Sequence, residues 1–271
     1  MGAAALIGVA TAPALHVMTF NVRRRLPLSI RRADRWTGRR RAVEALLTLE
    51  QPTVLGVQEA MPGQADAVAG ALGARYRRLG HGRDSRGRGE GCPLFWDAER
   101  LELLSGTQLA LSPTPAVAGS RGWGNPVPRV AVLARLRDRL TSRELTVVNT
   151  HLDVFSRRSR LHAARWLRGV LATGTTAGII LGDMNARPDS ATARELWAGG
   201  LRDAWPAADV RLTPEWATFA DYRAPRRGAR IDWIGVTPGV QVDAIGINAF
   251  RTDVGWPSDH LPVQARVRVC S

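Results

Sequence analysis

The chain has 271 residues, of which 45% are hydrophobic and 23% are charged, a balance that excludes a disordered chain and indicates a soluble globular protein with a substantial core. The formal net charge is +14 and all 38 basic residues are arginine, which fits a partner that carries phosphate groups and fits a biased genome composition equally well. The two cysteines, Cys92 and Cys270, indicate neither a disulfide framework nor a zinc site.

The first fourteen residues are small and apolar. They lack the positively charged start of a secretory signal, and they are too few to span a bilayer. We therefore treat residues 1–14 as an apolar extension and residues 15–271 as a single domain. We expect a cytoplasmic monomer without stable membrane insertion, although the sequence leaves secretion open.

The domain begins with a β-α-β pattern. Residues 15–22 are apolar and β-branched, as in a strand, and residues 40–50 place apolar side chains at helical spacing beneath an arginine-rich outer face. Residues 53–59 form a second, buried strand after the helix-ending Pro52. Two parallel strands joined by a helix predict a sheet that is covered on its outer face.

The rest of the chain contains more predicted strands than helices. Helices are expected at 65–72 and 159–172, a Gly/Arg-rich loop at 80–91, and no assignment is made for 190–225. Strands are expected at 92–96, 101–111, 129–137, 144–152, 177–181, 229–236 and 261–269. This excess of strands argues against a single doubly wound sheet and favours an α+β sandwich of two packed sheets with helices outside.

The stretch Gly182-Asp183-Met184-Asn185 follows the apolar run 177–181. Asp and Asn are ordinary turn residues, but a carboxylate and an amide at the mouth of a sheet are also what a hydrolase needs. We expect Gly182 to let the chain leave its strand sharply, so that the turn aims Asp183 and Asn185 at the sheet edge.

Other polar residues stand at the ends of predicted strands, and Asp232 interrupts the predicted strand 229–236. These residues are Asn21, Glu59, His151, Asp153, Asp183, Asn185, Asp232, Asp259 and His260. Each alone could simply end a strand, but Asp232 lies between Ile231 and Trp233 and needs a partner if it is buried. Together the carboxylates, amides and histidines predict a hydrolytic site for a hard cation such as Mg²⁺, which prefers oxygen ligands.

The order of these motifs resembles the endonuclease/exonuclease/phosphatase superfamily, whose members include deoxyribonucleases, sphingomyelinases and inositol-polyphosphate phosphatases. The resemblance rests on FNVR at 20–23, VQE at 57–59, NTHLD at 149–153, GDMN at 182–185, RIDWI at 230–234 and SDH at 258–260. It extends from residue 18 to residue 263, and the stretch 89–106 resembles the compact bacterial branch of that superfamily.

The resemblance implies a four-layer α/β/β/α sandwich with one site for Mg²⁺ or Mn²⁺. Glu59 would be the main metal ligand, with Asn21 and Asp259 beside it. Asp183 would orient or deprotonate the attacking water, and Asn185 would hold that water or a phosphate oxygen. His260 would contact the phosphate and Asp232 would orient His260. His151 would contact the leaving-group side, supported by Glu90, and Asp153 would be a further supporting residue.

The predicted activity is divalent-metal-dependent phosphoester hydrolysis. The substrate that we expect first among the candidates is a phosphodiester in nucleic acid. The arginine-rich segment 75–88 could contact its phosphates or simply be a solvated loop. Trp123, Trp216 and Trp256 could stack on a base or contact lipid, although buried packing is the more common role of Trp. Trp96 replaces the tyrosine of apurinic endonucleases, which disfavours an abasic-site substrate.

The alternative substrate is an inositol phosphate, a sugar phosphate or a sphingomyelin-like lipid. A non-catalytic phosphate-binding module is a third possibility, disfavoured because the whole catalytic set is present in the sequence.

Overall fold

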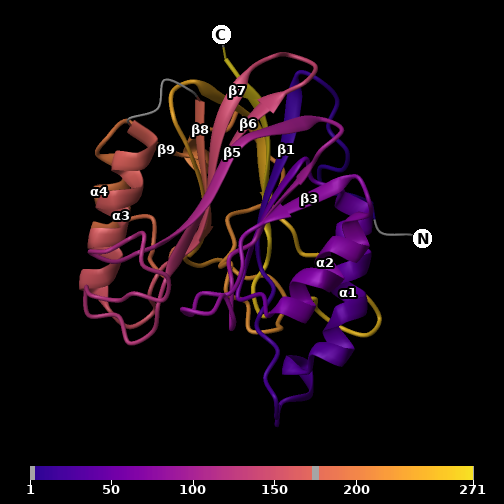
Figure 1. Cartoon of the computed structure of the whole chain (residues 1–271). Coiled ribbons are helices and arrows are strands. Elements are labelled where there is room, and N and C mark those ends of the chain that lie inside the picture. The colour runs from indigo at the N-terminus through magenta and orange to yellow at the C-terminus, as the bar shows by residue number, and fades with distance from the viewer. Residues whose placement is uncertain (1–3, 173–176, 271) are drawn as a thin grey trace.

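The computed structural model describes residues 4–172 and 177–270 and contains two packed β-sheets with helices on both outer faces (Figure 1). The first sheet has seven strands in the order β10 (Val210–Arg211), β12 (Val240–Ile247), β13 (Val263–Val269), β1 (Ala14–Asn21), β2 (Val54–Gln58), β4 (Leu94–Asp97) and β3 (Tyr76–Leu79). The second has six strands in the order β5 (Leu101–Ala110), β6 (Val130–Asp138), β7 (Glu144–His151), β8 (Ala177–Asp183), β11 (Asp232–Val236) and β9 (Arg202–Asp203).

Each sheet is covered by its own helices. Helices α1 (Trp36–Glu50) and α2 (Pro62–Leu72) pack on the seven-stranded sheet, and α3 (Arg157–Ala172) and α4 (Ala191–Trp197) pack on the six-stranded sheet. A 3₁₀ turn, η1 (Arg32–Asp34), precedes α1, and the short α5 (Ala204–Ala207) follows β9. The predicted four-layer α/β/β/α sandwich is therefore confirmed.

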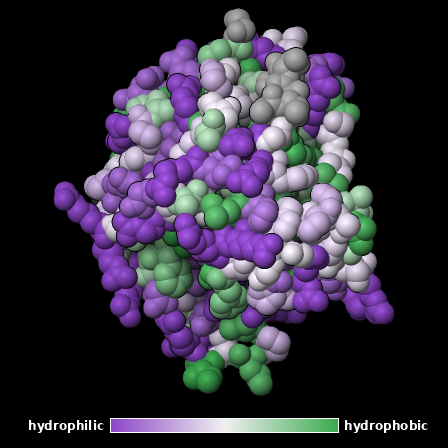
Figure 2. Space-filling model, turned by 90° about the vertical axis from the view of Figure 1, so that its left-hand side faces the viewer, coloured by the Kyte–Doolittle hydropathy of each residue, from purple (hydrophilic) through white to green (hydrophobic). Residues whose placement is uncertain are grey.

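The alternation of side chains along the strands divides the apolar residues among three cores. Val17 and Val54 face the space between the sheets, whereas their neighbours Met18 and Leu55 face α1 and α2. The outer surface over α3 and α4 is mostly hydrophilic, with scattered apolar patches (Figure 2). No helix in the described ranges combines the length and the hydrophobicity that crossing a bilayer requires.

Several predicted boundaries are wrong. Strand β12 was not predicted, because a register shift between Val242 and Ala244 interrupts its alternation. Helix α1 begins at Trp36 rather than at residue 40, since its first turn buries Trp36 and Arg39 instead of exposing an arginine face. The short strand β3 lies within the segment expected to be a phosphate-binding loop, and the unassigned region 190–225 contains α4, α5, β9 and β10.

The N-terminal extension contacts the end of α1. The carboxylate of Glu50 accepts hydrogen bonds from the backbone N–H groups of Leu6, Ile7 and Gly8, at 2.7, 3.2 and 3.0 Å. The side chain of Asn248 donates to the same carboxylate at 2.8 Å. Glu50 therefore joins the extension to α1 and to the segment after β12.

A buried polar bridge joins the two sheets. The side chain of Asn149, on β7, accepts a hydrogen bond from Gln58 on β2 at 2.7 Å and donates to the carbonyl of Val57 at 2.9 Å. Its amide also lies 2.9 Å and 3.0 Å from the carbonyls of Cys92 and Pro93. Gly56 makes room for this amide, because a Cβ at that position would lie 2.7 Å from the Asn149 oxygen.

Replacing Asn149 by alanine should lower the free energy of unfolding by at least about 3 kcal/mol, because the Gln58 amide and several carbonyls would lose a buried partner. Urea unfolding measures this loss. Asn125→Ala is the matched control, since Asn125 is also buried but bonds only within its own loop. Equal losses in the two variants would contradict the role of the bridge.

Candidate active site

The predicted site residues meet at one edge of the sandwich. Strands β1 and β2 are parallel, as are β7 and β8, so each pair brings its carboxyl ends to the same edge. Strand β11 runs antiparallel to β8 and places its first residue, Asp232, opposite Asp183. A pocket of about 500 Å³ opens there. The predicted residues that line it are Glu59, Glu90, His151, Asp183, Asn185, Asp259 and His260.

Three residues at this edge have a left-handed backbone. The φ angles of Arg23, Glu59 and Asn185 are 53°, 60° and 46°, a conformation that costs non-glycine residues energy and often occurs at functional sites. The turn after β8 is therefore made at Asn185. The prediction that Gly182 makes this turn is wrong. Gly182 lies within β8, where a Cβ would approach the carbonyl oxygen of Thr150 to 2.2 Å.

Asp232 and His260 form a buried pair. The Nδ1 atom of His260 lies 2.9 Å from Oδ2 of Asp232, so one oxygen of the buried carboxylate has a partner, whereas Oδ1 has no hydrogen-bond partner among the described residues. Burial acts to lower the pKa of His260, but the carboxylates of Asp232, Asp183 and Asp259 outweigh it and raise that pKa well above its ordinary value. His260 is therefore a cation at neutral pH, held by Asp232.

His151, in contrast, is neutral at physiological pH. Burial, assisted by the nearby guanidinium of Arg129, lowers the pKa of His151 to about 4. The side-chain amide of Asn185 lies 2.9 Å from Nε2 of His151, which fits an unprotonated Nε2 that accepts the hydrogen bond. The pocket thus presents one neutral and one protonated imidazole.

Asp183 lies between these two rings. Its Oδ2 atom accepts a hydrogen bond from the Asn21 amide at 3.0 Å and lies 3.5 Å from Nε2 of His151 and 3.8 Å from Nε2 of His260. Burial and the neighbouring charge of Asp232 raise the pKa of Asp183. A carboxylate with a raised pKa and hydrogen-bonding neighbours on one oxygen is suited to accept a proton.

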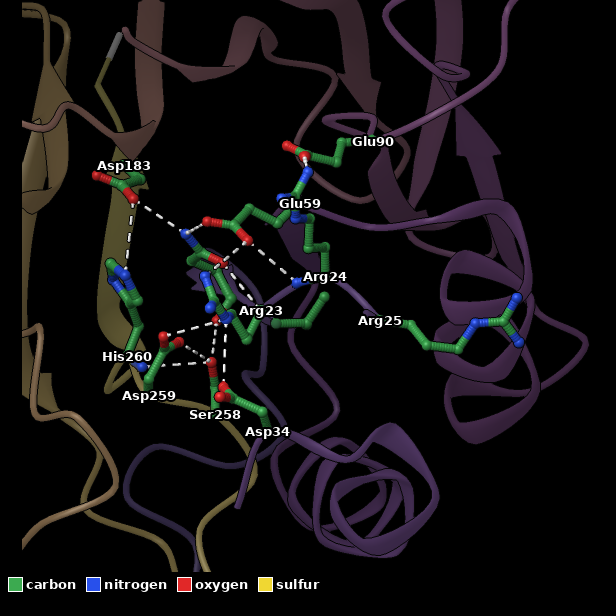
Figure 3. Close-up of polar contacts among 12 residues, drawn as sticks. Arg23, Arg24, Arg25, Asp34, Glu59, Glu90, Asp183, Ser258, Asp259 and His260 are labelled. Carbon is green, nitrogen blue, oxygen red and sulfur yellow. Dashed lines mark hydrogen bonds and ion pairs between the residues drawn. The ribbon is translucent and has the colours of Figure 1, made fainter. Parts of the chain in front are cut away.

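Glu59 and Asp259 form an acidic end of the pocket, with Arg23 between them (Figure 3). Glu59 accepts hydrogen bonds from the Asn21 amide and from the backbone N–H of Arg24, both at 3.1 Å. Burial acts to raise the pKa of Glu59, but His151 and these hydrogen bonds outweigh it and hold the pKa at about 2. Glu59 is therefore ionised over the physiological range.

The two supporting carboxylates bind arginines. Glu90 pairs with Arg24 at 2.6 Å and with Arg83 at 2.9 Å, and no contact with His151 is found for it in the described part of the chain. Asp153 is buried, accepts a hydrogen bond from Arg129 at 3.2 Å, and accepts backbone N–H groups at the start of the loop to α3. Both residues therefore position arginines that line the pocket and form its cationic wall: Glu90 positions Arg24 and Arg83, and Asp153 positions Arg129.

The sequence interpretation missed that wall. Arg23, Arg24, Arg83 and Arg129 line the pocket, but nothing in the sequence distinguishes them from the other arginines. Of the segment 75–88, Arg83 reaches the pocket, whereas other arginines of the segment pair elsewhere, as Arg75 does with Asp97 and Arg78 with Asp66.

The tryptophans pack within the fold, which is the more common role of this residue. Trp96 is buried between the sheets, and Trp123 stacks on His162 with the ring centroids 5.4 Å apart. Trp216 and Trp256 pack against the core between the sheets. The aromatic residues that line the pocket are instead Phe155 and Phe219, which are 78% and 45% exposed.

The profile of the Endonuclease/Exonuclease/phosphatase family matches residues 18–260, a range that contains every polar residue described above. The chain belongs to the endonuclease/exonuclease/phosphatase family. Solved structures of two members resemble it over nearly their whole length. A family protein from Bacteroides vulgatus is 27% identical, with 94% of this chain and 99% of that chain covered and a TM-score of 0.86. One from Bacteroides thetaiotaomicron is 25% identical, with 95% and 98% covered and a TM-score of 0.87.

A third structure shares the fold of this endonuclease/exonuclease/phosphatase family member. It is a mannosyl-6-phosphatase from Bacteroides thetaiotaomicron, 24% identical, with 93% of this chain and 99% of that chain covered and a TM-score of 0.85. No curated protein sequence matches the chain.

Proposed function

We propose that this chain is a phosphoester hydrolase that depends on Mg²⁺ or Mn²⁺ and in which water attacks phosphorus in line. The observation that carries the proposal is the position of Asp183, a carboxylate of raised pKa between a neutral and a protonated imidazole. Such an attack needs an aligned water and positive charge near the equatorial phosphate oxygens.

The side chains divide this work. Asp183 accepts the proton of the attacking water, and the Asn185 amide holds that water or a phosphate oxygen. Protonated His260 donates to a phosphate oxygen while Asp232 keeps the imidazole oriented and charged. His151 lies on the leaving-group side, where its neutral ring contacts the ester.

The residues at the acidic end fit a hard divalent cation. Glu59, Asp259 and Asn21 offer carboxylate and amide oxygens, the ligand types that Mg²⁺ prefers. The carboxyl groups of Glu59 and Asp259 lie near one guanidinium group, that of Arg23. A bound Mg²⁺ or Mn²⁺ would be held by these carboxyl groups and would supply positive charge toward the phosphate.

A second donor set lies nearby but fits a metal less well. Ligand atoms of Asp183, Asp232 and His260 lie within 4.8 Å of one another. His260 and Asp232 are already bonded to each other, however, and a protonated imidazole cannot ligate a metal. The ionised Glu59 is therefore our choice for the principal ligand.

The substrate that we propose first is a phosphodiester in nucleic acid, as the net charge of +14 favours. The alternative is a small-molecule or lipid phosphoester. The structural similarity to a mannosyl-6-phosphatase supports a small-molecule phosphoester. The exposed side chains of Phe155 and Phe219 at the pocket mouth support a lipid phosphoester. A cytoplasmic, monomeric protein remains part of the proposal.

Asp232→Asn should lower kcat by about 10⁴-fold, as loss of the orienting carboxylate does in a catalytic triad, while circular dichroism and the melting temperature stay near wild type. Asp243→Asn is the control, because Asp243 pairs with Arg268 on β13, far from the pocket. A kcat for the Asp232 variant within tenfold of wild type would refute the proposed role of the pair.

A substrate panel with and without EDTA tests the proposed function itself. The panel contains plasmid DNA, single-stranded RNA, bis(p-nitrophenyl) phosphate, inositol phosphates, mannose 6-phosphate and sphingomyelin. We expect hydrolysis of the nucleic acids that stops in EDTA and returns with added Mg²⁺ or Mn²⁺. Full activity in EDTA would exclude the metal, and release of phosphate or head group from the small or lipid substrates alone would establish the alternative.

A further inference from the structure

Residues 23–35, here called the basic loop, combine positive charge with an apolar tip. Arginines at both ends flank the apolar stretch Leu26-Pro27-Leu28-Ser29-Ile30. The loop contains six arginines and one acidic residue, Asp34, and therefore has five positive charges in excess. This pattern of an apolar tip between basic ends is typical of segments that bind a membrane surface.

The tip is fully exposed. Leu28 is 91% exposed and Ile30 is 101% exposed, more than any other large hydrophobic residue in the described ranges. Single exposed apolar residues are common, but two at one loop tip form a patch that gains free energy when it is covered.

The base of the loop is bound to the site residues. The backbone N–H of Arg23 donates to Asn21 at 2.9 Å, and that of Arg24 donates to Glu59 at 3.1 Å. The backbone N–H of Arg25 donates to Gln64 at 2.6 Å, and the Arg25 side chain points away from the pocket (Figure 3). The loop projects from the edge of the sandwich that bears the site (Figure 1), and its first residues, Arg23 and Arg24, line the pocket.

The charge of the basic loop is only partly neutralised. Arg31 pairs with Asp221 at 2.8 Å, but Arg25 and Arg32 have no ion-pair partner within residues 4–172 and 177–270. Exposed Phe155 lies at the mouth of the pocket. The basic loop thus combines free guanidinium groups with its apolar tip, and Phe155 adds an exposed apolar side chain at the mouth of the pocket.

We propose that the basic loop docks this protein on a membrane that contains anionic phospholipids. Leu28 and Ile30 enter the interfacial layer, the arginines contact lipid phosphates, and the pocket opens toward the head groups. Aliphatic side chains lack the flat π-face on which nucleic-acid bases stack, which favours lipid over single-stranded nucleic acid as the occupant. The inference rests on the proposed phosphoester hydrolysis and, between the two substrate classes proposed above, favours the alternative, a lipid phosphoester at the membrane surface.

Vesicle flotation of the whole protein in EDTA tests the docking. The vesicles contain phosphatidylcholine alone, or phosphatidylcholine and phosphatidylglycerol in equal parts. We expect wild type to float with the mixed vesicles and to be released by high salt, which screens the arginines. Leu28→Ser with Ile30→Ser should weaken the binding by roughly tenfold or more, since each side chain loses part of its burial free energy.

The matched control replaces two exposed leucines at the opposite end of the sandwich. Leu103 and Leu140 are 39% and 68% exposed and lie near the turn between β6 and β7, far from the pocket. Leu103→Ser with Leu140→Ser should bind the mixed vesicles like wild type. Both double variants should hydrolyse soluble bis(p-nitrophenyl) phosphate at the wild-type rate, which reports on the hydrolytic site alone.

Three results would overturn the docking surface. They are no binding of wild type to the mixed vesicles, equal losses in the two double variants, or a tip variant that binds vesicles normally but loses affinity for a single-stranded oligonucleotide. Tip-dependent vesicle binding by a protein that hydrolyses no substrate of the panel would support the docking surface and contradict the proposed hydrolase.

Discussion

The hydrogen bond between Asn149 and Gln58 determines how the two sheets meet. Asn149 stands two residues before His151, and Gln58 stands directly before Glu59, so this bridge sets the level of one sheet's site residues relative to the other's. A slip of one residue in either strand would turn His151 or Glu59 away from the pocket. The geometry of the whole site therefore depends on a buried polar contact between the two sheets.

The site concentrates charges that repel one another. Asp183 and Asp232 are opposite each other in neighbouring strands, and both are almost completely buried. The protonated His260 and the amide of Asn21 offset part of this repulsion. The same buried charge gives the pocket its chemistry, because it raises the pKa of Asp183 and keeps His260 protonated. The repulsion between buried carboxyl groups, which costs the fold stability, is thus also the source of the reactivity of the site.

Much of this arrangement was predictable from the sequence. Polar residues that end buried strands must lie where those strands leave the sheet, so the positions of Glu59 and Asp183 followed from the strand pattern. Asp232 was expected inside a strand over 229–236, but it is the first residue of β11. The partner of Asp232 was predictable in kind, since a buried carboxylate requires one. The identity of that partner as His260 came from the resemblance to a family.

Other features depend on contacts that no local pattern encodes. In a chain whose basic residues are all arginine, Arg83 and Arg129 resemble surface residues until the fold brings them to the pocket. Glu90 was expected to support His151, but two arginines occupy its carboxylate. The bulge in β12 hid a strand, because one extra residue moves the alternation to the other face of the sheet.

The position of the metal tests the account most directly. Crystals soaked with Mn²⁺ would give an anomalous difference peak at the bound ion. We expect one peak at coordination distance from an oxygen of Glu59, with Asp259 or Asn21 beside it, and with the hydrogen bond between Asp232 and His260 intact. A peak among Asp183, Asp232 and His260, with that bond broken, would contradict it.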